Sequence, residues 1–560
     1  MTIHADLATR TAAQVLVDQL RIQGVTHVFC VPGESYLPVL DALHGSGIQI
    51  IVCRNEGGAS MMAEAYGKQT GRPGVCFVTR GPGATNASGG IHIAQQDSTP
   101  MILFVGQVER ENRGRDAFQE MDYRVFFGGM AKWVAEINEP GRMGEMVARA
   151  FSTTLAGRQG PVVLSLPHDM LPLPSTSADA PFIDTVETAP GQAEMAALED
   201  LLAASERPML ILGGGRWSET ALRQIAGFAE DFGVPVCTSF RRAHHFHPAH
   251  PNYAGDLGLA ANPKLVARVK ASDLVIAAGA RLNELTSQGY TLFDIPTPQM
   301  KLVHAYPGAE ELGRVYRPHL AIHAAPQAFA AALAALRPRR AAHDVKSVHQ
   351  EYLDWSEKPL PQPGDVNLSE IMIWLRAHLP DDAIICNGAG NYAGWIHRFY
   401  RFRRFNTQMG TICGFMGYGM PAAVAMKAIH PERTVVAING DGDFLMNGQE
   451  LATAAQYKLP IIAVVLDNST FGTIRMHQER EYPGRVSGTD LVNPDFAAMA
   501  RAFGGFGARV EKTADFAPAF EAAQASGLPS VIHVKVDPEG ITPTATISGI
   551  RAKASGAPKH

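Results

Sequence analysis

The stretch TVVAINGDGDF, residues 434–444, decides the fold expected for this chain. Its apolar first half predicts a buried strand that stops at the glycines. Residues 449–457 predict a helix, and residues 461–466 predict a second buried strand, which together give a strand–turn–helix–strand unit. The glycines allow close approach of the backbone to a ligand, and a helix start behind Asp441 favours a phosphate.

Asn468 falls just past the end of the second predicted strand, at the edge where open α/β sheets place their ligands. An aspartate carboxylate and an amide oxygen brought together there suit Mg²⁺, which takes oxygen ligands and often bridges to phosphates. A lone Gly-Asp-Gly is more often a simple glycine turn with a capping aspartate, so the motif needs support from the rest of the chain.

Gly440-Asp441-Gly442, followed after 25 residues by Asn468, resembles the diphosphate-binding motif of thiamine-diphosphate (ThDP) enzymes. The resemblance implies ThDP and Mg²⁺ as cofactors, with the metal held by Asp441, Asn468 and the backbone carbonyl of Thr470. Ser469 stands where the family often has a second Asn.

Composition favours a soluble globular protein and excludes several other classes. The chain has 560 residues, enough for about three domains. A net charge of −5 gives no electrostatic footprint for nucleic acid, and no apolar run is long enough to span a bilayer. The N-terminus does not read as a signal peptide. The six cysteines are scattered singly, which favours buried free thiols in a reducing cytoplasm.

Strands and helices alternate along the chain, which predicts an α/β protein with doubly wound, mainly parallel sheets. Linker-like composition at 171–194 and 336–366 separates three domains. The expected domains are 1–172, 190–338 and 365–540, which the resemblance identifies as pyrimidine-binding, central and diphosphate-binding domains. Residues 541–560, small, polar and basic, are expected to be a flexible tail.

Glu56 is the leading catalytic candidate in the first domain. It follows a buried strand and precedes a helix rich in small residues, where a partly desolvated carboxylate can hold a proton. On the residues alone, a helix-start glutamate that stabilises the macrodipole is the simpler interpretation. The resemblance assigns Glu56 to the glutamate that hydrogen-bonds N1′ of the cofactor and promotes formation of the nucleophilic ylide.

Further motifs resemble the acetolactate-synthase-like branch of the family, namely GPGATN at 81–86 and DAFQE at 116–120. In this branch, Phe118 and Gln119 are implied to lie at the active site, although Phe118 can equally be a core aromatic. Gly33 is a further substrate candidate, beside Glu34, which replaces a glycine of the synthase pattern. Arg80 stands where synthases usually have Ser.

Further candidates lie in the third domain. GFMGYGMP at 414–421 resembles the synthase segment whose Met wedges under the cofactor, which makes Met416 the candidate here, although Met often merely fills core gaps. Thr473 and His477 replace a Met and a Trp of the synthase pattern; His477 is either an acid–base group near substrate or a surface histidine. The remaining cofactor-binding candidates share glycine-rich loops: Gly388, Gly390, Asn391, Gly414, Gly440, Gly442, Asp443, Phe471 and Gly472.

The central domain carries two strands that end in glycine loops, at Gly213-Gly214-Gly215 and Gly279-Ala280-Arg281. Their spacing is not the dinucleotide fingerprint. Synthases bind a non-redox FAD in the matching domain, so the resemblance leaves FAD open. The histidines at 244, 245, 247 and 250 are expected to be exposed loop residues rather than a metal site.

The resemblance implies ylide attack on a 2-oxo acid, loss of CO₂ and transfer of the enamine to a carbonyl acceptor. The alternatives are a related lyase, a simple 2-oxo acid decarboxylase, an acyltransferase on another substrate and a non-catalytic relative. The family pairs the glutamate of one subunit with the metal site of another, which implies a homodimer or homotetramer. A Rossmann oxidoreductase is a distant alternative.

Overall fold

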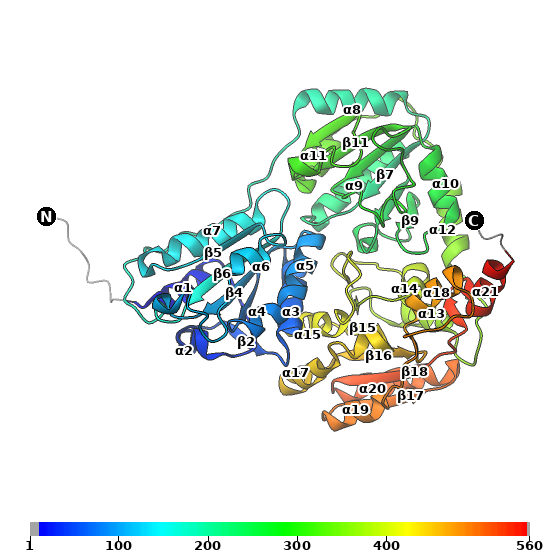
Figure 1. Ribbon diagram of the computed structural model, residues 1–560. Helices are drawn as coiled ribbons and strands as arrows, with labels where there is room; N and C mark the ends of the chain where they lie inside the picture. Colours follow the sequence, from blue (N-terminus) through cyan, green and yellow to red (C-terminus); the bar gives the residue numbers. More distant parts are fainter. Residues whose placement is uncertain (1–9, 557–560) are drawn as a thin grey trace. The chain divides into compact units, whose positions relative to one another are not determined.

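The computed structural model describes residues 10–556, and the chain divides into two compact units between Val186 and Glu187 (Figure 1). Each unit is built from parallel sheets covered by helices, which confirms the α/β prediction. Among the described residues, no helix is long and apolar enough to cross a membrane.

The first unit holds one six-stranded parallel sheet in the order β2-β1-β3-β4-β6-β5. Its strands are β1 (His27–Cys30), β2 (Gln49–Val52), β3 (Gly74–Val78), β4 (Met101–Gln107), β5 (Trp133–Glu136) and β6 (Pro161–Pro167). Its helices are α1 (Ala12–Ile22), α2 (Leu37–Leu43), α3 (Glu56–Thr70), α4 (Pro82–Asn86), α5 (Ser88–Asp97), α6 (Tyr123–Phe127) and α7 (Met143–Leu155).

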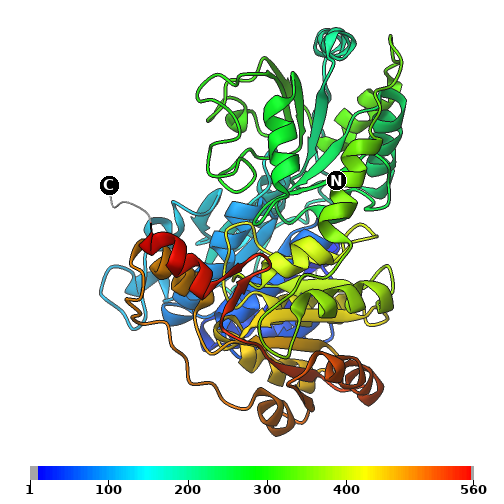
Figure 2. The ribbon, with the colours of Figure 1, turned by 90° about the vertical axis from the view of Figure 1, so that its right-hand side faces the viewer.

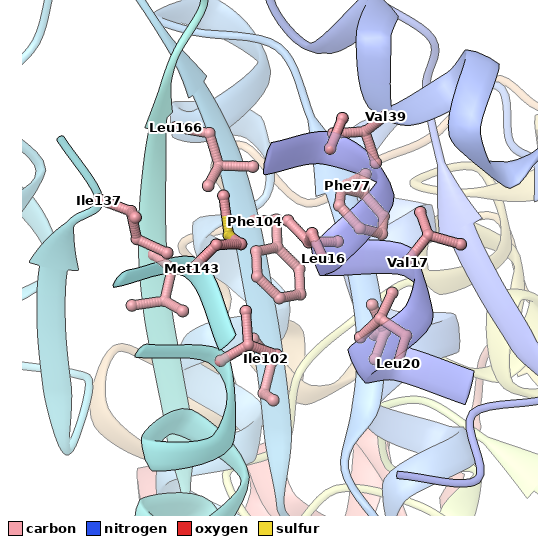
Figure 3. Packing of buried hydrophobic residues seen from close by; sticks show 14 of the residues in the cluster. Leu16, Val17, Leu20, Val39, Phe77, Ile102, Phe104, Ile137, Met143 and Leu166 are labelled. Carbon is pink, nitrogen blue, oxygen red and sulfur yellow. The ribbon is translucent and has the colours of Figure 1, made fainter. Parts of the chain in front are cut away.

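The core of this unit forms where α1 and α7 pack on one face of the sheet (Figure 3). Leu16 and Leu20 on α1 lie toward Phe77 and Phe104 on adjacent strands, whose rings stack with centroids 4.8 Å apart. A capping box closes the start of α1, where the Thr11 hydroxyl accepts a hydrogen bond from the Gln14 amide. The buried apolar side chains therefore fix the sheet that positions the loops at its carboxyl edge.

The second unit contains two six-stranded parallel sheets. The first has the order β12-β11-β10-β7-β8-β9. Its strands are β7 (Pro208–Leu212), β8 (Val236–Ser239), β9 (Tyr253–Leu257), β10 (Leu274–Ala278), β11 (Lys301–Tyr306) and β12 (Leu320–His323). Its helices are α8 (Gln192–Ala204), α9 (Glu219–Phe232), α10 (Pro263–Ala271), α11 (Pro326–Ala335) and α12 (Lys346–Ser356).

The other sheet of this unit has the order β14-β13-β15-β16-β18-β17, which repeats the strand order of the first unit's sheet. Its strands are β13 (Ile384–Asn387), β14 (Gln408–Met409), β15 (Val435–Gly440), β16 (Ile462–Asp467), β17 (Phe506–Val510) and β18 (Ser530–Lys535). Its helices are α13 (Leu368–His378), α14 (Ala393–Phe399), α15 (Gly419–Ile429), α16 (Asp441–Phe444), α17 (Leu451–Gln456), α18 (Gly472–Glu481), α19 (Phe496–Ala502) and α20 (Phe516–Ser526). The first and third sheets are thus alike and the middle one differs, as predicted.

Three predicted segments differ in detail. The helix expected after Glu56 begins at Glu56 itself, because the Asn55 side chain caps it by accepting from the Gly57 amide at 2.8 Å. The second linker contains a regular helix, α12. Its Val348 is buried in the hydrophobic cluster that includes Leu265 and Val269 of α10.

The segment from Ile541 onward, expected to be a flexible tail, instead forms regular structure as far as it is described. Two short strands, β19 (Gly540–Thr542) and β20 (Ala545–Thr546), pair antiparallel and lead into α21 (Ile547–Ser555), drawn in red (Figure 2). Arg551 on this helix forms an ion pair with Glu479 of α18 at 2.7 Å. The composition of the tail did not reveal this partner; residues 557–560 lie outside the described part of the chain.

Candidate cofactor site

The Gly-Asp-Gly turn lies at the carboxyl edge of the third sheet. Strand β15 ends at Gly440, and Asp441 opens the short helix α16. The neighbouring parallel strand β16 ends at Asp467. In the register of these two strands, Gly440 lies opposite Leu466. Asp441 and Asn468 therefore leave the sheet side by side, one strand spacing apart.

The loop after β16 is a tight turn. The Asn468 side-chain oxygen accepts a hydrogen bond from the Thr470 amide at 3.2 Å, and Ser469 adopts a left-handed backbone with φ of 54°. The Thr470 hydroxyl donates to the Thr489 carbonyl at 2.9 Å, which fixes the turn against the following segment. An aspartate, an amide and a turn carbonyl are hard oxygen donors, so the residues fit a magnesium ion.

Asn493 joins two carboxylates at this edge. Its side-chain amide donates to Asp441 at 2.7 Å and to Asp467 at 2.9 Å. Burial raises the pKa of Asp441 to about 6, against the hydrogen bonds from Gly442 and Asn493. Asp467 is also buried, but hydrogen bonds from His533 and Lys535 outweigh that burial and hold its pKa well below the ordinary value. The two carboxylates thus differ in environment, because Asp467 stays ionised beside the ammonium group of Lys535, whereas Asp441 accepts from the neutral amides of Gly442 and Asn493.

Asp443 is buried, with 2% of its surface exposed. One carboxylate oxygen accepts from the amides of Gly417 at 2.6 Å and Ala389 at 3.3 Å. The other accepts from the Tyr392 hydroxyl at 2.7 Å and the Asn439 side chain at 2.9 Å. Burial raises its pKa to about 6 despite these four donors.

Met416 is half-buried and lies in an irregular loop between Gly414 and Gly417, which have φ of 66° and 81°. Only glycine adopts such left-handed angles without cost. The Gly417 carbonyl accepts from the Asn447 side chain at 3.0 Å, so its peptide is held on both sides. The backbone next to Met416 is therefore fixed.

Gly388, Gly390 and Asn391 follow β13 and lie next to the start of α18. The Asn391 amide donates to the Thr473 hydroxyl at 3.1 Å, and that hydroxyl donates to the Asn391 side chain at 3.0 Å. Phe471 and Gly472 precede these contacts, and a Cβ on Gly442 would meet the Phe471 ring at 2.5 Å. His477, four residues beyond Thr473 on α18, is exposed. The candidates of this sheet thus share one edge, with His477 at the solvent side.

In the first unit, Glu56 lies at the carboxyl edge of its sheet. It is half-buried in the first turn of α3 and accepts a hydrogen bond from the Asn86 side chain at 3.0 Å. A Cβ on Gly83 would lie 3.4 Å from the other Glu56 oxygen, so the GPGATN loop packs closely on this carboxylate. One carboxylate oxygen is held by an amide, which orients the group.

The DAFQE segment lies beside the same loop. A Cβ on Gly81 would meet Gln119 at 2.8 Å, and Gln119 has a left-handed backbone with φ of 64°. Phe118 is 76% exposed, which excludes the core-aromatic alternative within this unit. Glu120 orders the turn by accepting from the Gly114 and Ala117 amides, and these bonds lower its pKa.

Gly33 packs directly on Thr79, where a Cβ would meet the threonine side chain at 2.4 Å. The neighbouring Glu34 pairs with Arg80 at 3.1 Å, and the Arg80 guanidinium also donates to the Phe118 carbonyl at 3.2 Å. The strand ends of this sheet thus bring Gly33, Glu56, Phe118 and Gln119 to one edge.

The central sheet places its two glycine loops in contact with each other. A Cβ on Gly214 would meet the Gly279 carbonyl at 1.9 Å, and the Trp217 indole donates to the Gly213 carbonyl at 2.8 Å. The Arg242 guanidinium donates to the Gly214 carbonyl at 2.8 Å. The two glycine loops are therefore held against each other by a backbone contact and by bonds from Trp217 and Arg242.

Two of the four loop histidines differ from expectation, because His244 and His245 are buried, whereas His247 is exposed as expected and His250 is half-buried. The His244 ring accepts from the Gln408 amide at 3.1 Å, and Phe405 packs on both rings. Burial holds the pKa of His245 well below its ordinary value. Among residues 10–556, no group of three or more His, Cys, Asp or Glu side chains is placed to hold a metal.

Several residues of this region carried no local signal in the sequence. Arg241, Tyr392 and Asn493 contact candidate residues that lie far away along the chain, whereas Asn439 contacts Asp443 only four residues on. Five of the six cysteines are buried and Cys413 is half-buried, all with free thiols, as expected.

Comparison with known proteins identifies the family. Residues 10–125, 195–333 and 388–534 match the N-terminal TPP-binding, central and C-terminal TPP-binding domains of thiamine pyrophosphate enzymes. The chain belongs to this enzyme family, and thiamine diphosphate is the cofactor that the family's domains bind.

The relatives are acetolactate synthases. The acetolactate synthase isozyme 2 large subunit of Escherichia coli K12 is 32% identical over 533 residues, which cover 94% of this chain and 95% of the relative. The acetolactate synthase large subunit of Parasynechococcus marenigrum is 33% identical, covering 99% and 92%. A probable acetolactate synthase large subunit of Methanocaldococcus jannaschii is 31% identical, covering 95% and 93%. The resemblance to the acetolactate-synthase-like branch is confirmed, and the chain is an enzyme of that kind.

Proposed function

We propose that this enzyme is a carboligase that removes CO₂ from a 2-oxo acid and joins the remaining fragment to a carbonyl acceptor. When bound, ThDP supplies the carbanion chemistry of decarboxylation and ligation. The proposal is carried by one observation beside the family relationship: the carboxyl edge of the third sheet gathers Asp441, Asn468 and the Thr470 turn.

The proposed metal ligands are Asp441, Asn468 and the Thr470 carbonyl, with Mg²⁺ as the metal. Asn493 holds one Asp441 oxygen by a hydrogen bond of 2.7 Å, which orients the carboxylate. Gly440, Gly442, Gly388, Gly390 and the loop around Met416 offer the backbone against which the cofactor would lie.

Glu56 is the proposed proton-holding carboxylate, and Asn86 orients it through the bond at 3.0 Å. Gln119, Phe118 and Gly33 are proposed to line the substrate side, because they share that sheet edge with Glu56. In the proposed homodimer or homotetramer, the Glu56 of one copy serves the metal site of another. The proposed location is the cytoplasm, which suits the free thiols.

A second candidate function is a related lyase, decarboxylase or acyltransferase with a different substrate. It is favoured by four departures from the synthase pattern, namely Glu34, Arg80, Thr473 and His477, because all four lie on segments that carry substrate candidates. His477, the last of these four residues in the chain, is exposed, and we propose that it contacts the substrate from the solvent side of the site.

The test is a panel of 2-oxo acids, with and without aldehyde or 2-oxo acid acceptors, assayed for CO₂ and for the ligated product. The carboligase proposal expects CO₂ release and a stoichiometric ligation product with at least one acceptor. Release of CO₂ with only the aldehyde product favours a decarboxylase instead. No consumption of any 2-oxo acid in the presence of Mg²⁺ and ThDP contradicts both.

A further inference from the structure

Asp443 collects hydrogen bonds from three separate segments of the chain. Its donors are the Ala389 amide and the Tyr392 hydroxyl after β13, the Gly417 amide before α15, and the Asn439 side chain at the end of β15. The distances run from 2.6 Å to 3.3 Å. One buried carboxylate therefore links the strand end with both glycine loops that flank it.

Such a carboxylate is costly to bury unless donors surround it. Here four donors do so, and charge-assisted bonds of this kind are stronger than bonds between neutral groups. The reverse also holds, because the Gly417 and Ala389 amides would lose their acceptor if the carboxylate were removed. Leaving such an amide without an acceptor is unfavourable, most of all at the buried Gly417.

The loop at 387–391 is held from two directions. A Cβ on Gly388 would lie 2.0 Å from Asp443 Oδ1, so the loop backbone rests directly on the carboxylate. The Gly388 carbonyl accepts a hydrogen bond from the Arg241 guanidinium at 2.5 Å. Arg241 follows β8 in the central sheet, is 1% exposed and has a left-handed backbone with φ of 58°. The central sheet thus supplies a buried cation to the far side of this loop.

The loop at 414–418 is held in the same way. The Gly417 amide donates to Asp443, and its carbonyl accepts from the Asn447 side chain at 3.0 Å. The Gly417 φ of 81° and the close contact of its missing Cβ with Met446 at 2.8 Å leave little freedom at this position. Met416 directly precedes Gly417, so its backbone position follows from that of Gly417.

We infer that Asp443 is a positioning residue, which sets the loops at 387–391 and 414–418 in their cofactor-accepting conformation before the cofactor arrives, while Arg241 braces the first loop from the central sheet. The inference rests on the proposed cofactor site for its purpose. Its structural part, the pinning of two loops by one side chain, stands without it. A carboxylate with a merely structural role would change the stability of the fold and leave the loops' readiness for ligand unchanged.

The test compares Asp443→Ser and Asp443→Asn with a milder change, Tyr392→Phe, and with one control, Glu450→Gln. Tyr392→Phe removes one of the four donors and leaves both loop amides paired. Glu450→Gln alters another fully buried carboxylate near the third sheet. This carboxylate accepts a hydrogen bond from the Thr453 hydroxyl at 2.6 Å. Hydrogen exchange of the cofactor-free protein reports the Ala389 and Gly417 amides, and fluorescence titration with ThDP at fixed Mg²⁺ reports affinity.

For Asp443→Ser we expect exchange at both amides to rise at least about tenfold and ThDP affinity to fall by about the same factor, a tenfold change being 1.4 kcal/mol. Saturating ThDP should restore most of kcat, because the chemistry of Glu56 is untouched. Asp443→Asn should lie between Ser and the parent, since it keeps one acceptor oxygen. Glu450→Gln should stay within about twofold of the parent in exchange and affinity, and Tyr392→Phe should lie between Asp443→Asn and the parent, because three donors remain.

Unchanged exchange and unchanged affinity in both Asp443 variants, with only a lower melting temperature, would overturn the inference. If Asp443→Ser does not fold, Asp443→Asn decides by the same two readouts. A parent protein that fails to bind ThDP contradicts the proposed function, whereas the exchange experiment on the cofactor-free protein still decides whether Asp443 pins the loops.

Discussion

Arg80 and Glu34 form an ion pair, with 3.1 Å between a guanidinium nitrogen and a carboxylate oxygen. Both residues depart from the synthase pattern, where Ser and Gly stand at these positions, and the structure shows that the two departures are partners. The Arg80 guanidinium also holds the Phe118 carbonyl, so the pair connects three segments at one sheet edge.

We predict that Arg80→Ser changes substrate preference more than stability. Glu34 is 64% exposed, so the pair should contribute only about 0.2–1 kcal/mol to unfolding free energy. Loss of the bond to Phe118 should free the DAFQE segment and change kcat/KM unequally across a panel of 2-oxo acids. Glu34→Gly and the double variant complete a double-mutant cycle. An equal loss of kcat/KM for every 2-oxo acid in all three variants contradicts a role in specificity.

Replacement of Glu56 by Gln should lower kcat by at least about 100-fold, the lower range for removal of a positioned acid–base group. The amide keeps the size of the side chain and can still contact Asn86, so ThDP affinity should stay close to that of the parent. Glu111→Gln, an exposed change in the same unit, is the matched control. Turnover of the Gln variant at the parent's rate rules out the proposed role of Glu56.

Removal of the metal by a chelator should abolish ThDP binding, and added Mg²⁺ should restore it, because the diphosphate is proposed to bind through the ion. Asp441→Asn keeps an oxygen but loses the charge, so the Mg²⁺ concentration for half-maximal binding should rise at least about tenfold. Asp490→Asn, at a carboxylate that is 83% exposed in a nearby loop, is the control. Titration calorimetry measures ThDP affinity and its dependence on Mg²⁺ for each protein. A ThDP affinity that the chelator does not change contradicts the proposed metal site.

Much of the fold could be predicted because its strands are apolar runs closed by glycine or proline. The strands Pro208–Leu212 and Leu274–Ala278 end directly before the glycine loops, as predicted, and the helix Leu368–His378 begins after a capping asparagine. Their signals are local: buried strands between two helix layers are continuously apolar, and Asn367 caps the helix through the Ser369 and Glu370 amides.

What could not be predicted depends on partners that are distant along the chain. His244 and His245 are buried because Phe405 and Gln408 lie over them, and the sequence gives no sign of that packing. The same holds for Arg241, whose acceptor is the Gly388 carbonyl. At the site, glycine motifs located the candidate loops, whereas the side chains that fix those loops had no pattern of their own.

The purified protein should carry no flavin. The glycine loops of the central sheet contact each other, and Trp217 and Arg242 bond to their carbonyls, so a dinucleotide at this sheet edge would have to displace these contacts. The visible spectrum of the pure protein is the measurement, repeated after incubation with FAD and gel filtration. An absorbance band near that of bound flavin, retained through the column, contradicts this reading of the central sheet.

The docking of the C-terminal helix on α18 should weaken in acid. Glu479 is buried and receives two bonds from Arg551, at 2.7 Å and 2.8 Å, and these lower the pKa of Glu479 from its ordinary 4.5 to about 2. A carboxyl group whose pKa is lowered by folding stabilises the folded state above its unfolded pKa, and this contribution is lost as the pH falls toward the folded value. The window is therefore pH 4.5 down to about 2.

Helix α21 should accordingly become accessible to an acid-active protease within that window, while it stays protected at neutral pH. Arg551→Ala should raise cleavage within residues 547–555 several-fold already at neutral pH, because among the described residues Glu479 then keeps Arg475 and the Gly484 amide. Lys553→Ala, an exposed change on the same helix, is the control. Because Ile541 packs on Gly472 at the start of α18, a loosened tail should also reduce ThDP affinity. Equal cleavage of both variants at every pH would show that the Glu479–Arg551 pair does not hold this helix in place.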